Sequence, residues 1–341
     1  MHIFVDETGS FTGIGQSPSV SLVGALIVPD ALLDRLERKY AKLRKASPKD
    51  EKGEVKGRLL NEQQIACVVP LLLEHSALFE TASIDLGLHT EEGLKAFQAQ
   101  QAEKMTGGLT DQHYQSLSEQ VWEKRRRFES FKLPLMVQTM ITFELFPRLI
   151  EFGIMYYSTR RPKELGAFNW VIDAKGNMET PTEWEDWWSL VIMPYLQTRS
   201  FHEPYRHLRV GDYTSLARFE IEPDAFVQKM SSWKDGDPPP LDLKAILTES
   251  FRFLSSSTPG LELADIVTNA TRRALMGNLQ KSGWGRIPEL MIHRKGKGNS
   301  YISVHALQDI RPQALPYARV LNAYGRGGRC MLPATLSNKK F

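Results

Sequence analysis

Cysteine and long apolar runs are both scarce in this sequence, and each scarcity excludes a class of protein. Only two cysteines, Cys67 and Cys330, occur among the 341 residues. Their number and spacing exclude a disulfide framework and a cysteine-ligated zinc site, so we expect a reducing, cytoplasmic location. No apolar run approaches the ~20 residues of a membrane span, and the segment MHIFVDETGSF lacks signal-peptide features. We therefore expect no membrane partner.

An excess of charge of one sign is also missing. The chain has 43 Lys and Arg against 40 Asp and Glu, which gives a net charge of +3. This weakly basic balance is compatible with an anionic partner but does not require one. Hydrophobic residues make up 42% and charged residues 24% of the chain, and these fractions are typical of a folded globular protein.

Short apolar stretches bounded by turn residues alternate along the chain with segments of helical periodicity. We predict strands at 2–6, 19–28, 77–87, 168–173 and 246–255, and a loop at 234–242. We predict helices at 30–43, 61–75, 133–157, 182–197 and 258–276, the third of which either kinks or restarts near Pro147. This alternation indicates the α/β class, and the strands are too few for a large barrel.

The chain is predicted to form one main domain with two additions. Residues 1–280 form the domain, and a helical segment at about 90–165 is interpreted as an insertion into it. The insertion is a candidate for a substrate clamp or for a surface that joins two copies in a homo-oligomer. Residues 281–341 are basic and contain several glycines, so they are interpreted as a C-terminal extension.

Two of the predicted strands end in an acidic residue, Asp6 and Asp173. The carboxyl ends of strands in an open α/β sheet border the crevice in which ligands bind. A strand that is buried is also an unfavourable place for an unpaired charge. Each residue could instead be an ordinary turn acid that bonds its own backbone. The position of these two acids favours a role as cation ligands.

Asp265 lies in the segment GLELADIVTNATRR, where polar residues follow one another at helical spacing. Glu262, Asn269 and either Arg272 or Arg273 lie three or four residues from one another or from Asp265, so they form one polar stripe. The stripe is either the solvated side of an amphipathic helix or the wall of a metal cleft. In the second case Arg272 or Arg273 would lie near substrate phosphates.

Four short motifs occur in a fixed order along the chain. They are Asp6-Glu7-Thr8-Gly9, Glu54-Val55-Lys56, Val171-Ile172-Asp173 and Leu261-Glu262-Leu263-Ala264-Asp265. In this order the chain resembles a bacterial family catalogued as domain of unknown function 3800. The resemblance covers about residues 2–275, with Thr8 in place of the usual Ser and Glu262 in place of a common Gln. It implies a ribonuclease H-like fold, with a mixed sheet flanked by helices, and nuclease activity.

The resemblance also implies a metal site made of four acids. Asp6, Glu54, Asp173 and Asp265 would meet, although Glu54 taken alone lies in a segment typical of a solvated loop. Two like charges ~4 Å apart repel by about 4 kcal/mol at an effective dielectric constant near 20, so such a cluster calls for cations. Oxygen ligands favour two Mg²⁺ or Mn²⁺ ions. Lys56 either contacts a phosphate or is simply exposed.

The function predicted from these residues is metal-dependent cleavage of phosphodiester bonds in DNA or RNA by a two-metal mechanism. The alternative is a non-catalytic nucleic-acid-binding or regulatory module on the same fold. Basic clusters at 124–127, 160–163 and 293–297 either line a groove that follows a nucleic-acid backbone or form solvated surface. A role in bacterial defence is expected from the type of family alone.

Overall fold

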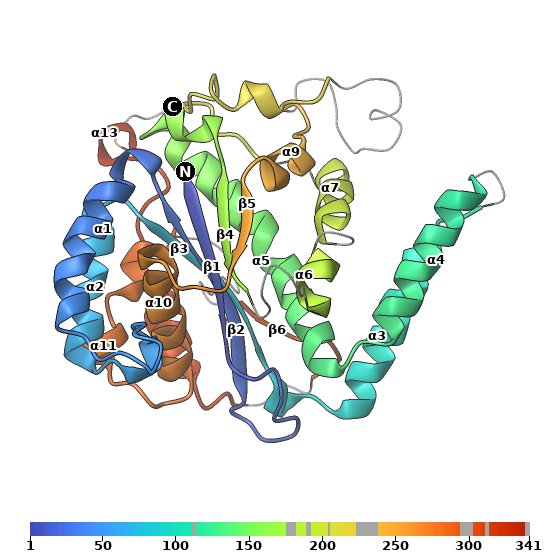
Figure 1. Cartoon of the computed structure of the whole chain (residues 1–341), viewed down its shortest axis with the longest axis horizontal. Coiled ribbons are helices and arrows are strands. Elements are labelled where there is room, and N and C mark those ends of the chain that lie inside the picture. Colours follow the sequence, from blue (N-terminus) through green and yellow to red (C-terminus); the bar gives the residue numbers. More distant parts are fainter. Residues whose placement is uncertain are drawn as a thin grey trace.

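A six-stranded mixed sheet forms the centre of the molecule in the computed structural model (Figure 1). The structure describes residues 1–110, 114–174, 182–188, 192–203, 205–222, 238–293, 303–310 and 314–337. The strands are β1 (His2–Thr8), β2 (Val20–Val28), β3 (Leu78–Asp85), β4 (Asn169–Asp173), β5 (Phe251–Leu254) and β6 (Ser303–His305). Their order across the sheet is β5-β4-β1-β2-β3-β6.

Within this sheet, β2 runs opposite to the other five strands. β1, β2 and β3 pair in antiparallel fashion as consecutive neighbours. On the other side of β1, β4 runs parallel to β1 and β5 runs parallel to β4. The sixth strand, β6, pairs with β3 in parallel. The predicted α/β class and the mixed sheet flanked by helices are therefore confirmed.

Helices cover both faces of this sheet (Figure 1). One face packs against α1 (Asp30–Lys45), α2 (Glu62–Glu74), α10 (Pro259–Leu275) and α11 (Lys281–Trp284). The other face packs against α5 (Leu133–Ser158), α6 (Glu183–Trp187), α7 (Met193–His202) and α9 (Leu243–Thr248). Alternation along β1 separates the two cores, because Phe4 faces α10 whereas Ile3 and Val5 face α5.

Glycines allow α10 to lie directly against the sheet. A Cβ atom on Gly24 of β2 would lie 2.3 Å from the Thr268 hydroxyl oxygen of α10. A Cβ atom on Gly260 would lie 2.2 Å from ring atoms of Phe4. Neither position has room for a larger residue, so the absence of two side chains sets the distance between α10 and the central strands.

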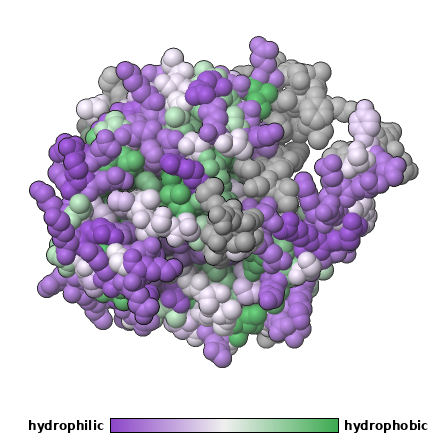
Figure 2. Space-filling view, in the orientation of Figure 1, coloured by the Kyte–Doolittle hydropathy of each residue, from purple (hydrophilic) through white to green (hydrophobic). Residues whose placement is uncertain are grey.

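The helical segment that projects from the molecule is smaller than the insertion expected at 90–165. Only α3 (Glu91–Thr106) and α4 (Gln115–Glu129) form the projecting hairpin (Figure 1), and its visible surface is mainly hydrophilic (Figure 2). The Gln98 side-chain amide ties the base of the hairpin by donating to the carbonyls of Phe128 at 2.7 Å and Phe131 at 3.1 Å. By contrast, α5 packs on β2 and β3 and belongs to the core.

The apolar character of α5 comes from this core position. α5 is long and apolar enough to cross a membrane by length and composition, but 61% of its most apolar window is buried inside the protein. It continues through Pro147 as one helix, so it does not restart there as a second helix. A helix buried against a sheet needs an apolar surface on most of its circumference, and α5 is accordingly a core helix.

The C-terminal region is integrated into the fold rather than attached to it. In the described part of 281–341, β6 extends the sheet, and Trp284 stacks on Tyr324 with ring centroids 5.5 Å apart. Both aromatic side chains belong to the core on the α10 side. This region also contains α12 (Ala318–Tyr324) and α13 (Ala334–Ser337). The region expected to be a basic C-terminal extension therefore contributes apolar side chains to that core.

One predicted strand is shorter in the structure than the sequence indicates. The strand expected at 246–255 begins later, because Leu243–Thr248 forms α9 and only Phe251–Leu254 forms β5. Asp242 caps α9 by accepting a hydrogen bond from the Ala245 amide at 2.9 Å, which commits this segment to a helix. Residues 234–237 of the loop expected at 234–242, and residues 294–297 of the basic cluster expected at 293–297, lie outside the described residues. Short 3₁₀ helices occur at Gly57–Leu59 (η1), Leu86–Leu88 (η2), Pro162–Gly166 (η3), Ala217–Phe219 (η5) and Ile287–Leu290 (η6).

Candidate metal centre

Asp6 and Asp173 lie side by side at the carboxyl ends of β1 and β4. The two strands are parallel, and their last paired residues are Val5 and Ile172. Asp6 and Asp173 follow directly, and alternation turns both side chains toward α10. Asp6 is only 6% exposed to solvent. The structure thus brings together the two acids that the sequence places at strand ends.

Asp265 approaches this pair from α10, which packs across β1. The helix begins at Thr258, whose hydroxyl oxygen accepts a hydrogen bond from the Leu261 amide at 3.3 Å. Asp265 lies two turns further along, and one of its carboxylate oxygens accepts a hydrogen bond from the Gly57 amide at 2.7 Å. A Cβ atom on Gly57 would lie 2.9 Å from the Asp265 carbonyl, so this contact requires glycine.

Burial and mutual repulsion raise the pKa values of all three carboxyl groups. Burial contributes most to raising the pKa of Asp6 well above its usual range, followed by the charges of Asp265, Glu7 and Asp173. Burial, and then the charge of Glu7, raises the pKa of Asp173 to about 6. Burial also raises the pKa of Asp265, although the Gly57 amide and the charge of Lys56 oppose it. The three acids therefore destabilise one another when they are ionised.

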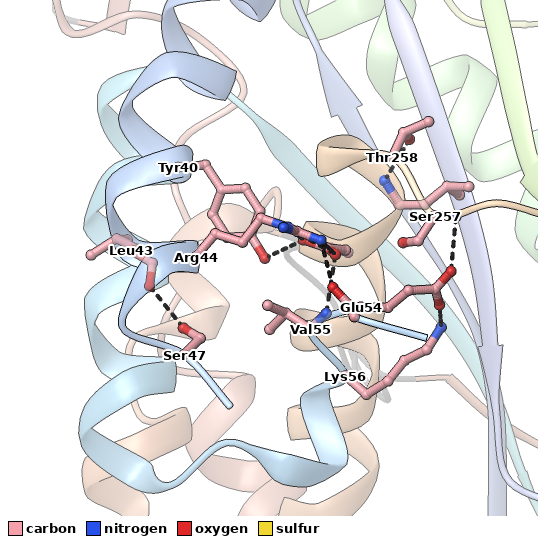
Figure 3. A network of polar contacts seen from close by, with 12 residues as sticks. Tyr40, Leu43, Arg44, Ser47, Glu54, Val55, Lys56, Ser257 and Thr258 are labelled. Atoms are coloured by element: carbon pink, nitrogen blue, oxygen red, sulfur yellow. Dashed lines mark hydrogen bonds and ion pairs between the residues drawn. The ribbon is translucent and has the colours of Figure 1, made fainter. Parts of the chain in front are cut away.

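Glu54 belongs to the same region but is neutralised within its own loop. Its carboxylate pairs with the Lys56 ammonium at 2.7 Å and accepts a hydrogen bond from the Ser257 amide at 3.1 Å (Figure 3). Burial alone would raise the pKa of Glu54, but these two donors outweigh burial and lower it. The positive charge of Lys56 also lowers the pKa of Asp6. Lys56 is thus a cation held within the acidic region.

A second acid of α10, Glu262, holds the loop that carries Glu54 and Lys56. The Glu262 carboxylate is buried and accepts hydrogen bonds from the Arg44 guanidinium at 2.8 Å and the Tyr40 hydroxyl at 2.9 Å. It also accepts one from the Val55 amide at 3.0 Å, so it holds the loop between Glu54 and Lys56. The sequence predicts that Glu262 lies on the polar stripe of α10 but does not indicate a role for it. In the structure Glu262 is a positioning residue for the loop that carries Glu54 and Lys56.

The turn before Glu54 completes this scaffold. Arg44 reaches past Glu262 and donates to the Gly53 carbonyl at 2.8 Å. Gly53 has a φ of 77°, a conformation that favours glycine. The Asp50 carboxylate accepts hydrogen bonds from the amides of Lys52 and Glu54, each at 3.0 Å. The loop is therefore fixed on both sides of Glu54, although it has no regular secondary structure there.

The sequence predicts that Arg272 or Arg273 lies near substrate phosphates, but in the structure both guanidinium groups donate to backbone carbonyls. Arg272 donates to the Val20 carbonyl at 2.7 Å, and Arg273 donates to the carbonyls of Gly57 at 3.1 Å and Leu60 at 2.7 Å. Both residues begin about 10 Å further along the helix axis than Asp265. Their hydrogen bonds hold β2 and the 57–60 segment against α10. Lys56 therefore stays a candidate phosphate contact, and the exposed Arg58 joins it, because its charge opposes the rise in the pKa of Asp265.

The chemistry of this region fits hard divalent cations. One carboxylate oxygen of Asp6 is buried and lacks a hydrogen-bond partner among the described residues, and such an oxygen is a ready cation ligand. Among the residues that the structure describes, no three or more Asp, Glu, His or Cys side chains are arranged so that they could hold a metal ion together. Glu54 and Asp265 are turned to Lys56 and Gly57 respectively, so cation binding would require these side chains to exchange partners.

Comparisons with known proteins add no relative. No family model matches the chain, and no match was found among curated proteins or among solved structures. The resemblance to the bacterial family stays a prediction. The function proposed below therefore rests on the geometry of the acids and of the elements that carry them.

Proposed function

We propose that the protein is a metal-dependent nuclease with a ribonuclease H-like core. The observation that carries the proposal is the meeting of Asp6, Asp173 and Asp265 from three distant chain segments, with a buried Asp6 oxygen that lacks a partner among the described residues. Such a group is costly in a fold unless a ligand compensates it. The three antiparallel strands β1–β3, continued by β4 and β5 parallel to β1, are compatible with the fold proposed.

Four carboxylates would hold the ions in this proposal. Asp6 and Asp173 form the base of the site, and Glu54 and Asp265 reach it from the loop and from α10. Bound Mg²⁺ or Mn²⁺ would activate a water and neutralise the leaving oxygen of a phosphodiester. The protein contributes a fixed frame, because Glu262 and Asp50 hold the loop at both of its ends.

The substrate would be held by the two cations of the loop. Lys56 lies beside Glu54, and Arg58, two residues further along the chain in η1, is exposed. When Glu54 turns to a metal ion, the Lys56 ammonium is released to bind a phosphate oxygen as a point charge. The scissile phosphate would lie between the acidic base and these two side chains. This arrangement gives nucleic acid as the proposed partner, with no base-specific contact implied.

A cleavage assay tests the proposal. The full chain is incubated with single- and double-stranded DNA, RNA and hybrid duplexes in the presence of Mn²⁺ or Mg²⁺. Cleavage is expected, and Asp6→Asn and Asp173→Asn should each reduce it by about a thousandfold or more, since each removes a charged ligand. Asp34→Asn, an exposed acid of α1, should leave it unchanged. Cleavage that survives both site variants would rule out this assignment.

The ion pair between Lys56 and Glu54 favours one alternative. An internal cation neutralises part of the acidic region, as would suit a nucleic-acid-binding or regulatory module that works without metal. Calorimetric titration separates the two functions. Uptake of Mn²⁺ at micromolar to millimolar concentration is expected for the nuclease, whereas salt-sensitive nucleic-acid binding without metal uptake would favour the alternative.

A further inference from the structure

The polar side of α10 continues inward beyond the acids already described. Asp265, Thr268 and Asn269 have spacings of three and four residues, so they lie on one side of the helix. Glycines let this side approach the sheet closely. Thr268 is 0% and Asn269 is 8% exposed. A polar seam therefore runs through a helix–sheet interface that is otherwise packed with apolar side chains.

The sheet places matching polar groups along this seam. The Thr268 hydroxyl lies over Gly24, which is the cross-strand partner of Asp6 in the register of β1 and β2. The Asn269 amide nitrogen donates to the hydroxyl of Thr8 at 3.1 Å, and Thr8 faces α10 from the same side of β1 as Asp6. Thr268 and Asn269 of α10 thus lie opposite Asp6, Gly24 and Thr8 of the sheet.

Three buried oxygens in this seam have no hydrogen-bond partner among the described residues. They belong to the Asp6 carboxylate, the Thr268 hydroxyl and the Asn269 side-chain carbonyl. Each buried oxygen of this kind destabilises a fold, because it has lost its hydrogen bonds to water without gaining a partner in the protein. A buried threonine can avoid this loss, as Thr139 of α5 does by donating to the Leu135 carbonyl at 2.9 Å. Three orphans on facing elements indicate a shared ligand.

We propose that Asp6, Thr268 and Asn269 form an inner subsite for one of the two divalent cations. This inference rests on the proposed metal-dependent function and names ligands that neither the motifs nor the acidic cluster includes. Asn carbonyl and hydroxyl oxygens are hard ligands that suit Mg²⁺ or Mn²⁺. Only one ligand of the inner subsite is charged, so its ion binds more weakly than the ion held by the outer acids. The two ions therefore bind with unequal affinity.

Calorimetric titration of the full chain with Mn²⁺ tests the inner subsite without measuring activity. The wild type should show two binding events of different affinity. Asn269→Leu, which keeps the volume but removes the oxygen, should weaken the second event by at least about tenfold and leave the first unchanged. Thr268→Val should act in the same direction with a smaller effect. Asn269→Asp adds a charged oxygen and should tighten the second event by about tenfold or more.

Controls separate this inference from a purely structural role. Thr139→Val removes a hydroxyl that is satisfied on the opposite face of the sheet and should leave both events unchanged. Asn269→Asp is also the safeguard against misfolding, because it retains an oxygen at the same place. If Asn269→Leu and Thr268→Val bind both ions with wild-type affinity, the oxygens hold water and the inner subsite is refuted. If the wild type takes up no Mn²⁺, the proposed nuclease function fails together with it.

Discussion

The two helix–sheet interfaces of this protein contain different kinds of buried side chain, aromatic on one face and acidic on the other. On the α5 face, Trp170 of β4 is fully buried, stacks on Phe146 at a centroid distance of 5.0 Å, and donates to the Ile246 carbonyl at 2.8 Å. On the α10 face, β4 ends in Asp173 and the neighbouring strand β1 carries Asp6 two residues before its end, and the pKa values of both carboxyl groups are raised. One interface stabilises the fold, and the other holds repelling charges that the fold must tolerate.

The α10 face is expected to be the less stable of the two interfaces, because its buried acids serve the proposed function. Buried carboxylates that repel one another lower the free energy of unfolding, whereas a satisfied aromatic core raises it. Substitutions on the α5 face should therefore destabilise the protein, while neutral substitutions of the mutually repelling acids Asp6 and Asp173 on the α10 face should stabilise its metal-free form. The following four predictions test this contrast.

Trp170→Ala should produce the largest loss of stability. The substitution removes a fully buried indole and leaves a cavity between α5 and the sheet, so the free energy of unfolding should fall by about 3–5 kcal/mol. Urea unfolding followed by tryptophan fluorescence and circular dichroism measures this change. A loss below about 1 kcal/mol would show that the α5 face is not the stabilising interface.

Glu262→Ala should destabilise the α10 face, because this acid is satisfied and not a repelling one. Its removal leaves the Tyr40 hydroxyl and the Val55 amide without an acceptor, and the half-exposed Arg44 without its partner. We expect a loss of about 2–3 kcal/mol. Glu262→Gln, which retains an acceptor, should lose less. Equal losses in the two variants would contradict the role of Glu262 as an acceptor for the loop.

Asp6→Asn should stabilise the metal-free protein at pH 7.5 by roughly 2 kcal/mol. The variant keeps the shape of the side chain but removes a buried charge that Asp265 and Asp173 repel. Thermal unfolding in the presence of a chelator measures the gain, and Asp34→Asn on the exposed surface of α1 serves as its control. A destabilised Asp6→Asn protein would mean that the carboxylate is satisfied within the fold.

Asp173 should give the metal-free protein a stability that falls with rising pH. Its pKa is raised from 3.8 to about 6 by folding, so its contribution is fully present below about pH 4 and lost as the pH rises through 6. Partial exposure limits the loss to about 1–2 kcal/mol. The difference between the wild type and Asp173→Asn isolates this contribution from other titrating groups. A difference that is constant from pH 4 to 7.5 would contradict it.

The base of the candidate site could be predicted from the sequence because local patterns determine it. A short apolar strand that ends in an acid predicts both the position and the direction of Asp6 and Asp173. The spacing along α10 correctly predicts that Asp265 and Asn269 share one side of the helix. These features depend on periodicity and on the order of elements, and both can be read from one chain.

Features that depend on pairing between distant segments could not be predicted in the same way. Arg272 and Arg273 lie on the expected helix, but only the folded chain shows that backbone carbonyls of Val20, Gly57 and Leu60 take their donors. β6 has only three residues, too few for a periodic pattern, and pairs with β3 more than 200 residues away. The pairing of Lys56 with Glu54 likewise depends on the loop conformation that Glu262 imposes.

Diffraction from crystals soaked in Mn²⁺ tests the central claim most directly. The account predicts anomalous density between the carboxyl ends of β1 and β4 and α10, with carboxylate oxygens of Asp6, Asp173 and Asp265 at about 2.0–2.3 Å from manganese. Density elsewhere, or none at a manganese concentration of several millimolar, would contradict it.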